Sequence, residues 1–294
     1  MTALDVRPTT GAELRALRRR RLVRRFFRRK LAVIGLVAAS LTMAVAVFAP
    51  LLAPYDPSAV DFANVFDAPS ASHWLGTDEL GRDVLSRIIF GSRAAMQVGV
   101  GAVALGFLCA VPIGLVSGYV RGWVDAVIMR IVDALLAFPF VILTIGFAAI
   151  FGPSLFLATV AIGISLVPGL IRIVRGETLA LREEEYVAAA VANGAGTGTI
   201  MFRHLLPNMR NTLIVQATVL IPLSIIIESV VSFLGLGVQP PTPSWGVMLS
   251  RAQTELGTAA HLSVAPGVAI LIATLAFNLL GDGLRDVLDP KDRD

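Results

Sequence analysis

The sequence predicts an all-α polytopic membrane protein with six transmembrane helices, both termini in the cytoplasm and one long, structured cytoplasmic loop. Hydrophobic residues make up 55% of the 294 positions and charged residues only 16%, against roughly 25% charged residues in soluble domains. A soluble domain of this size cannot bury so much apolar material, so much of it must face lipid. The apolar runs are continuous rather than alternating, which favours helices over a transmembrane barrel.

Charge-free runs mark the predicted crossings, because a hydrocarbon core about 30 Å thick needs roughly 20 helical residues. Residues 134–171 carry no charge but are too long for one crossing. The turn signal Gly152-Pro153 divides this run into two spans. The predicted crossings are therefore residues 31–55, 94–120, the two halves of 134–171, 211–236 and 262–281.

The basic residues set the orientation of these spans. Of the 25 lysine and arginine residues, 21 lie in the segments 1–30, 121–130, 172–210 and 282–294. The positive-inside rule places these segments, and with them both termini, in the cytoplasm. The other side carries only Arg82, Arg87, Arg93 and Arg251. The chain thus divides into a basic cytoplasmic segment 1–30, a first transmembrane helix 31–55, an extracytoplasmic loop 56–92, a core of five transmembrane helices 93–281 and a cytoplasmic tail 282–294.

The basic run at residues 18–30 admits two interpretations, a nucleic-acid contact or an attraction to lipid. It directly abuts the first span, and anionic lipid contributes about 1 kcal/mol per basic residue near the inner leaflet. We therefore expect the lipid bilayer as its partner and no nucleic acid. The first span is longer than a signal-peptide core and lacks a clear cleavage site, so we expect it to stay as an anchor.

Two outer loops carry local signals. In the loop 56–92, Thr77 is placed to cap a helix over residues 77–89 whose first turn holds Asp78 and Glu79, and we expect this helix to lie at the outer membrane surface. In the loop 237–261, three prolines at positions 240, 241 and 243 predict an extended, stiff segment. This segment serves either as a cap over the bundle or as a contact with an outer partner.

The inner loop 176–210 is the most informative segment. Residues 178–192 are predicted to form a helix that Asn193-Gly194 ends. A second short helix begins at Thr197 or Thr199 and ends at Pro207. Packed helices need connections of only about 2–8 residues, so this loop is too long and too structured for a plain connector. It is either an amphipathic pair resting on lipid or a docking site.

The residues of this loop resemble a known motif. Ala188-Ala189-Ala190, then Gly194 and Leu206-Pro207, resemble the EAA motif of ABC-importer permease subunits, and more specifically the second permease of the dipeptide/oligopeptide/nickel branch. Two positions depart from the broad motif, because its glutamate falls at Ala188 and its isoleucine at His204. Further segments similar to that branch are residues 76–87, 122–125, 202–208, 232–241 and 278–286, so the resemblance covers about residues 24–290.

The resemblance implies a type I ABC importer permease fold in the plasma (bacterial inner) membrane. The subunit is then expected to act mechanically and to catalyse no reaction of its own. Such a subunit pairs with a second homologous permease, receives substrate from an extracytoplasmic solute-binding protein, and is driven by two ATP-binding subunits. ATP and Mg are expected on those partners, because the chain has no P-loop pattern around Lys30 or Lys291. We expect no catalytic residue, no cofactor and no metal site, since the three histidines are scattered.

The resemblance also implies which residues transmit motion. ATP binding and hydrolysis in the partners are expected to move the inner-loop helices and so tilt the spans at 155–175 and 211–236, opening a central cavity alternately outward and inward. The residues expected to make the coupling contact are Glu185, Tyr186, Ala188, Ala189, Gly194, Arg203 and Pro207.

Glu228 is the one acidic residue well inside a span. A charge at the bilayer centre costs about 2.5–3.5 kcal/mol on insertion scales, so this carboxyl must face protein or water. It either faces the pathway or pairs with an arginine for structural reasons.

Two rival functions remain open to test. An ion-coupled secondary transporter acts without ATPases and often shows inverted repeats, which this sequence lacks. An intramembrane protease needs a nucleophile and a base inside the membrane, but the surroundings of Ser165 do not match a nucleophile elbow and no histidine falls within a span. The substrate is left open among dipeptides, oligopeptides, nickel and other solutes, with short peptides favoured.

Overall fold

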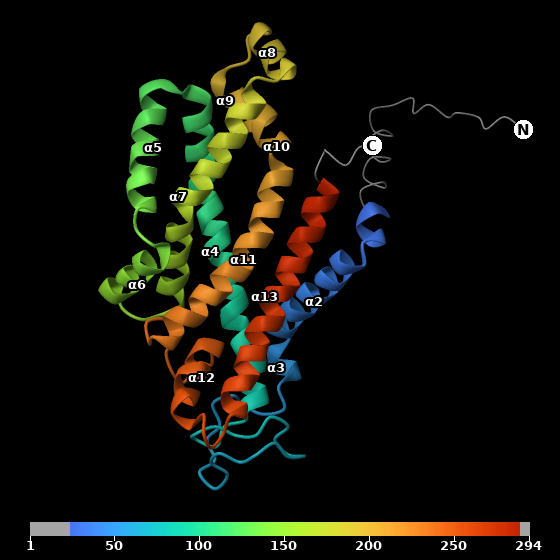
Figure 1. Ribbon diagram of the computed structural model, residues 1–294, viewed down its shortest axis with the longest axis vertical. Helices are drawn as coiled ribbons and strands as arrows, with labels where there is room; N and C mark the ends of the chain where they lie inside the picture. The colour runs from blue at the N-terminus through green and yellow to red at the C-terminus, as the bar shows by residue number, and fades with distance from the viewer. Residues whose placement is uncertain (1–23, 289–294) are drawn as a thin grey trace, which may run out of the picture.

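The computed structural model describes residues 24–288, which form a bundle of long helices (Figure 1). Five helices are long and apolar enough to cross a membrane. Within the described residues, the only β pairing is an isolated bridge between Thr77 and Asp83. The five helices are α2 (Lys30–Val47), α4 (Val84–Val120), α7 (Leu155–Arg182), α11 (Arg210–Phe233) and α13 (His261–Leu288).

A bent pair of helices makes a sixth crossing if the pair is counted as one span. Helix α5 (Gly122–Leu136) and helix α6 (Phe140–Phe151) are bent by 85° relative to each other. The break falls at Pro139, which has no N–H to continue the helix and disfavours helical backbone in the residue before it. All-helical architecture and up to six spans agree with the prediction.

The third span begins earlier than predicted. Residues 121–130 were expected to form an inner connection, but helix α5 already starts at Gly122. Its acidic residues are tolerated because α7 supplies arginines to them. The Asp125 carboxylate accepts hydrogen bonds of 2.6 Å from Nε and Nη2 of Arg175, and Asp133 accepts one of 2.6 Å from Arg172.

The helices pack through small residues, which let backbones approach closely in lipid. Helices α4 and α7 run side by side in the same direction, and a Cβ at Gly114 of α4 would lie 2.7 Å from Cβ of Val174 in α7. Helices α2 and α13 cross equally closely, because a Cβ at Gly35 would overlap the backbone of Leu280. An ion pair between Arg29 and Asp286 joins the same two helices at their inner ends.

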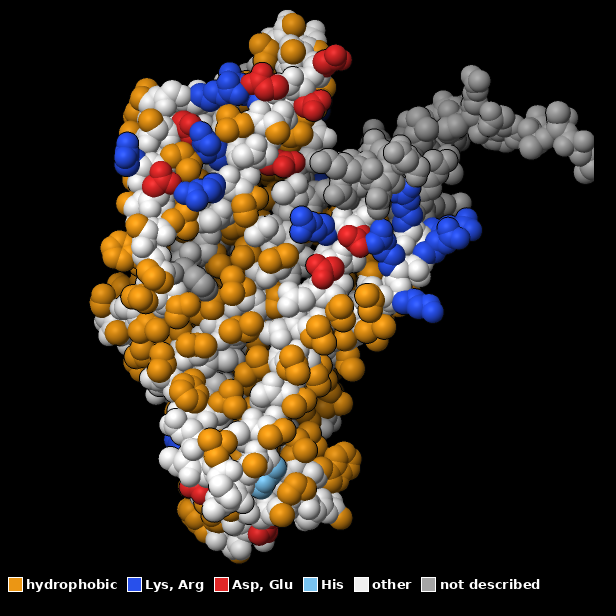
Figure 2. All heavy atoms as spheres, viewed as in Figure 1, with side chains coloured by type: hydrophobic (Ala, Val, Ile, Leu, Met, Phe, Trp, Pro, Cys, Tyr) orange, Lys and Arg blue, Asp and Glu red, His pale blue; other side chains and the backbone are white. Residues whose placement is uncertain are grey.

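The bundle has two distinct ends (Figure 1). The start of α2, the corner between α4 and α5, the end of α13 and the short helix α8 (Glu185–Ala192) lie toward one end. The irregular segment before α4 and the helix α12 (Trp245–Ala252) lie at the other. Figure 2 shows a broad band of hydrophobic side chains between the two ends, with most of the charged side chains above it.

The expected surface helix over residues 77–89 does not form, because the helix begins only at Val84 and is the outer start of α4. Thr77 does not cap it. Its hydroxyl donates to the carbonyl oxygen of Asn64. Residues 77–83 instead close into a tight turn around Asp78, whose Oδ1 accepts the backbone N–H of Arg82 at 3.0 Å. The cap of α4 is Asp83, which accepts the N–H of Ser86 at 2.8 Å.

Buried ion pairs hold this outer turn against the bundle. Asp78 Oδ2 lies 2.7 Å from Arg82 Nε and 3.3 Å from Arg87 Nε. Glu79 lies 2.8 Å from Arg82 Nη2 and 3.2 Å from Arg251 of α12. Arg82 and Arg87 are both buried. The segment with three prolines forms no helix, as predicted, and α12 starts directly after it at Trp245.

Candidate functional site: the inner loop

The inner loop connects α7 to α11 through short helical pieces. The chain turns at Glu183 and Glu184, forms α8, and then passes through α9 (Thr197–Thr199), the π-helix η1 (Ile200–Leu205) and α10 (Leu206–Asn208). Helix α8 projects farthest from the bundle at its upper end (Figure 1). The loop is therefore a knob at one tip of the molecule.

The predicted helix over residues 178–192 is two helices. The part before Glu183 belongs to α7, which runs unbroken out of the bundle to Arg182. The backbone of Glu184 is extended, with φ −72° and ψ 143°, so the chain changes direction there before α8 begins.

Pro207 also differs from its predicted role, because it does not end the second helix. It lies in the first turn of α10, and α11 follows at Arg210. The turn before it is widened, with the N–H of Leu206 donating to the carbonyl of Met201. Since proline has no N–H to place, it fits after such a turn without a lost hydrogen bond.

A small hydrophobic core fixes the knob to the bundle. Val187 is the buried residue of α8 and is only 2% exposed. It packs in one cluster with Leu115 of α4, Val174 of α7, and Ile200 and Leu205 of the π-helix. The loop is thus anchored on the inner parts of α4 and α7.

The residues predicted to make the coupling contact share one property, exposure. Helix α8 packs against η1. The exposed residues of α8 and those of the returning segment, from α9 to α10, therefore lie on one projection. Gly194 lies in the turn between α8 and α9 with φ 78°, a backbone conformation that glycine adopts readily. The exposed residues are Glu185, Tyr186, Ala188, Ala189, Gly194, Arg203 and Pro207.

Tyr186 also links α8 to α10, through a hydrogen bond with Asn208. Burial raises the pKa of its phenol above the ordinary value, the charge of Glu184 raises it further, and a hydrogen bond with Asn208 acts in the opposite direction. The phenol therefore keeps its proton at neutral pH and remains available as a donor.

Sequence reasoning missed the contacts that join the loop to the corner between α4 and α5. Glu183 forms an ion pair of 2.6 Å with Arg121. Arg182 donates to the carbonyl oxygen of Tyr119 at 2.7 Å, and its guanidinium lies 5.3 Å from the centre of the Tyr119 ring. The sequence shows the opposite charges of Glu183 and Arg121, but it does not show that two positions so far apart in the chain lie together. Glu183 thus supplies an acid to the loop where the motif's own glutamate is replaced by Ala188.

Glu228 has neither of its predicted environments. Its side chain is 1% exposed, and within residues 24–288 it forms no ion pair with an arginine. Its carboxyl instead accepts the Ser232 hydroxyl at 2.7 Å and lies 3.5 Å from that of Ser229. Ser232 in turn accepts the N–H of Val238 at 3.1 Å, so Glu228 fastens the end of α11 to the following outer loop.

The metal and protease hypotheses can be compared with the described residues. Among them, no group of three or more His, Cys, Asp and Glu residues is placed to hold a metal ion. The hydroxyl of Ser165 donates to the carbonyl of Ala161 at 2.8 Å and accepts from Thr144 at 2.9 Å, with no histidine as base. This arrangement is that of a packed helix rather than of a nucleophile.

Comparisons with known proteins identify the family. Residues 110–294 match the binding-protein-dependent transport system inner membrane component, and residues 18–69 match the N-terminal transmembrane domain of oligopeptide transport permease C. The glutathione transport system permease protein GsiD of Pectobacterium atrosepticum is 44% identical over 269 residues, covering 91% of this chain and 89% of that protein.

Two further relatives give the same result. The dipeptide transport system permease protein DppC of Alkalihalophilus pseudofirmus is 44% identical over 262 residues, covering 89% of this chain and 86% of that protein. The GsiD protein of Shigella dysenteriae is 43% identical over 269 residues, covering 91% and 89%. The chain therefore belongs to the binding-protein-dependent transport inner membrane components and is a multi-pass permease subunit of an ABC importer, a transporter component rather than an enzyme.

Proposed function

We propose that this chain forms half of the translocation pathway of an importer for short peptides in the bacterial inner membrane. A second homologous permease forms the other half, and an extracytoplasmic binding protein delivers the substrate. Two separate ATP-binding subunits, which hold ATP and Mg, drive the cycle through the inner loop. The observation that carries this proposal is the anchored knob whose seven predicted contact residues are all exposed.

The knob has the properties of a force-bearing contact. Val187 is buried in the core beneath it, so a push on α8 is transmitted to the bundle instead of bending the loop. Ala188 and Ala189 present small side chains on the exposed face, which allows the surface of a partner to approach the helix backbone. The exposed Val191 and Phe202, 54% and 55% exposed, add apolar area to the same projection.

Motion of the knob has direct routes into the membrane. Its two ends are continuous with α7 and, through η1 and α10, with α11. The Arg121–Glu183 ion pair and the Arg182–Tyr119 contacts add a third route, to the corner of α4 and α5. A displaced knob is therefore expected to move α4, α5, α7 and α11 together.

The substrate class rests on the relatives. Their names refer to dipeptide and to glutathione transport, and both solutes are short peptides that carry carboxylate and ammonium groups. We therefore propose short zwitterionic peptides as substrates. The alternative of an ion-coupled transporter is disfavoured because it gives the knob no partner.

Reconstituted uptake tests the proposal. Proteoliposomes with the two permeases, the ATP-binding subunits and the binding protein should import labelled dipeptide or glutathione only with Mg-ATP. Ala189→Glu at the tip should abolish import, whereas the matched control Ala260→Glu, at an exposed alanine on the outer side, should not. Uptake by this chain alone under an ion gradient contradicts the proposal.

A further inference from the structure

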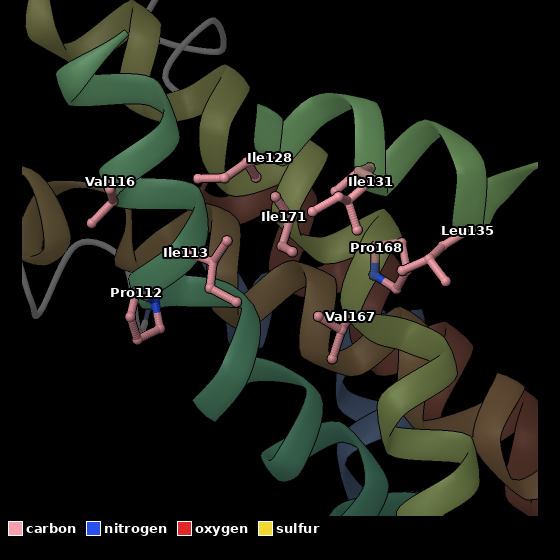
Figure 3. A pocket seen from close by; sticks show the side chains of 10 residues that line it. Pro112, Ile113, Val116, Ile128, Ile131, Leu135, Val167, Pro168 and Ile171 are labelled. Carbon is pink, nitrogen blue, oxygen red and sulfur yellow. The ribbon is translucent and has the colours of Figure 1, made fainter. Parts of the chain in front are cut away.

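A cavity of about 540 Å³ lies between α4, α5 and α7, and Val116 in its wall also packs against the hydrophobic cluster beneath the knob. Figure 3 shows the side chains of these three helices converging on it, with Ile113, Ile131 and Val167 as one example from each. Every residue that lines it is Pro, Val, Ile or Leu. The cavity therefore offers an occupant hydrocarbon contacts and no side-chain hydrogen bond.

This wall excludes the transported solute and favours an apolar occupant. A site for a polar ligand places a few hydrogen-bonding groups among its apolar ones, and this one has none among its side chains. Ordered water also needs polar partners. Neither a peptide nor a cluster of ordered water suits the space.

The cavity lies at the depth of the inner leaflet. At about 1.5 Å per residue, Val167 and Ile171 are roughly 18 and 24 Å along α7 from its outer start at Leu155. A hydrocarbon core about 30 Å thick therefore contains both positions in its inner half. The cavity is reached from the side, because Ile131 is 57% and Leu135 39% exposed. In a bilayer, lipid acyl chains lie at this depth.

Charged groups stand at the inner rim. The Asp125 carboxylate accepts hydrogen bonds from Arg175 and from the Ser117 hydroxyl, so α4, α5 and α7 are joined by polar contacts on the inner side of the cavity. Beside these contacts, the Arg172 side chain is 55% exposed and lies 2.6 Å from Asp133. Arg130 is exposed, but with 3.6 residues per turn it lies on the face of α5 opposite the lining residues Ile128 and Val132. Arg172 lies roughly 26 Å along α7 from Leu155, so its long side chain can extend to the phosphates at the inner boundary of the hydrocarbon core.

We propose that this cavity binds an acyl chain of an anionic inner-leaflet phospholipid, whose phosphate contacts Arg172. The chain fills the space that separates α5 from α4 and α7. Helix α5 depends on such a filler, because Val132 is its only buried residue within the described structure. The site does not depend on which substrate is transported. A test of the lipid site is therefore separate from a test of the proposed function.

Photolabelling of the assembled transporter tests the site. The probe is phosphatidylglycerol with a photoreactive group midway along one acyl chain, in vesicles of phosphatidylethanolamine. Labelling, mapped by mass spectrometry, should concentrate on residues 112–116, 128–135 and 167–171, above the level on Leu271 and Leu275, which are 61% and 52% exposed on α13.

Filling the cavity gives the decisive comparison. Val167→Phe should lower labelling of these segments at least about fivefold, and Ile113→Phe, from the opposite wall, should do the same if the first variant folds poorly. Leu275→Phe is the matched control and should change nothing. Labelling that merely follows exposure, or that survives both filling variants, overturns the proposal. So does loss of labelling in the assembly with labelling retained in the isolated chain, because a helix of the second permease would then be the occupant.

A separate experiment tests the contact with the lipid headgroup. Arg172→Gln should reduce labelling by phosphatidylglycerol about fivefold, the factor expected for one basic residue near the membrane surface, and should reduce labelling by the zwitterionic phosphatidylcholine less. Equal labelling by the two lipids in the unaltered protein overturns the preference for an anionic headgroup, because both lipids carry a phosphate.

Discussion

Replacing Val187 by alanine should release the knob while leaving the bundle folded. The side chain is 2% exposed, so the change removes two buried methyl groups. At about 0.8 kcal/mol for each transferred group, with a further contribution from the cavity left behind, the cost is about 2–3 kcal/mol. Helix α8 has eight residues and no side-chain cap hydrogen bond, and a helix this short is unstable alone. Docking through Val187 therefore accounts for most of its stability.

Hydrogen–deuterium exchange measures this loss directly. A cost of 2 kcal/mol raises the undocked population about 30-fold, since 1.4 kcal/mol corresponds to a factor of ten, and the amides of α8 should exchange faster by that factor. Those of α4 and α7 should not change. Val191→Ala is the matched control, because Val191 lies on the same helix but is 54% exposed. If both variants accelerate exchange equally, or neither does, the buried anchor is not what holds the knob.

Two predictions concern the outer end, both measured by thermal unfolding of the purified chain. Gly246→Ala should destabilise by about 1–3 kcal/mol, because the new methyl group overlaps a backbone oxygen of α11. Gly257→Ala, with no atom within 4 Å of the added methyl, should leave the stability unchanged. Equal destabilisation by the two variants would contradict the close packing at Gly246. Arg87→Met should cost about 3 kcal/mol, since it leaves Asp78 buried with one cation fewer. Arg251→Met, at a side chain 45% exposed, should cost less than about 1 kcal/mol, and the reverse order would contradict the buried network.

The crossings were predictable because the bilayer imposes a simple rule on composition. A long run without charge has few places to go other than lipid, so α2, α4, α7, α11 and α13 follow from the sequence. The family motifs add what composition lacks, since they identify the inner loop as the region of interest. Both signals are local along the chain.

The wrong predictions share the opposite property, because distant residues decide them. Thr77 has a good capping pattern, yet Asp78 binds the arginines that follow it and folds residues 77–83 into a turn. Helix α5 tolerates acidic residues because α7 supplies arginines. Glu228 finds serine hydroxyls instead of an arginine. Each outcome depends on which segments meet, and a single sequence does not contain that information.

Cross-linking from the tip of the knob tests the central claim, that separate ATP-binding subunits drive this chain through the inner loop. Cys109 is the only native cysteine, so Cys109→Ala provides a clean background for Ala189→Cys. In the assembled transporter, a short bifunctional maleimide should join this position to an ATP-binding subunit, with a yield that changes when Mg-ATP is added. Import without any such contact, or labelling of the same cysteine from outside intact cells, would contradict the account.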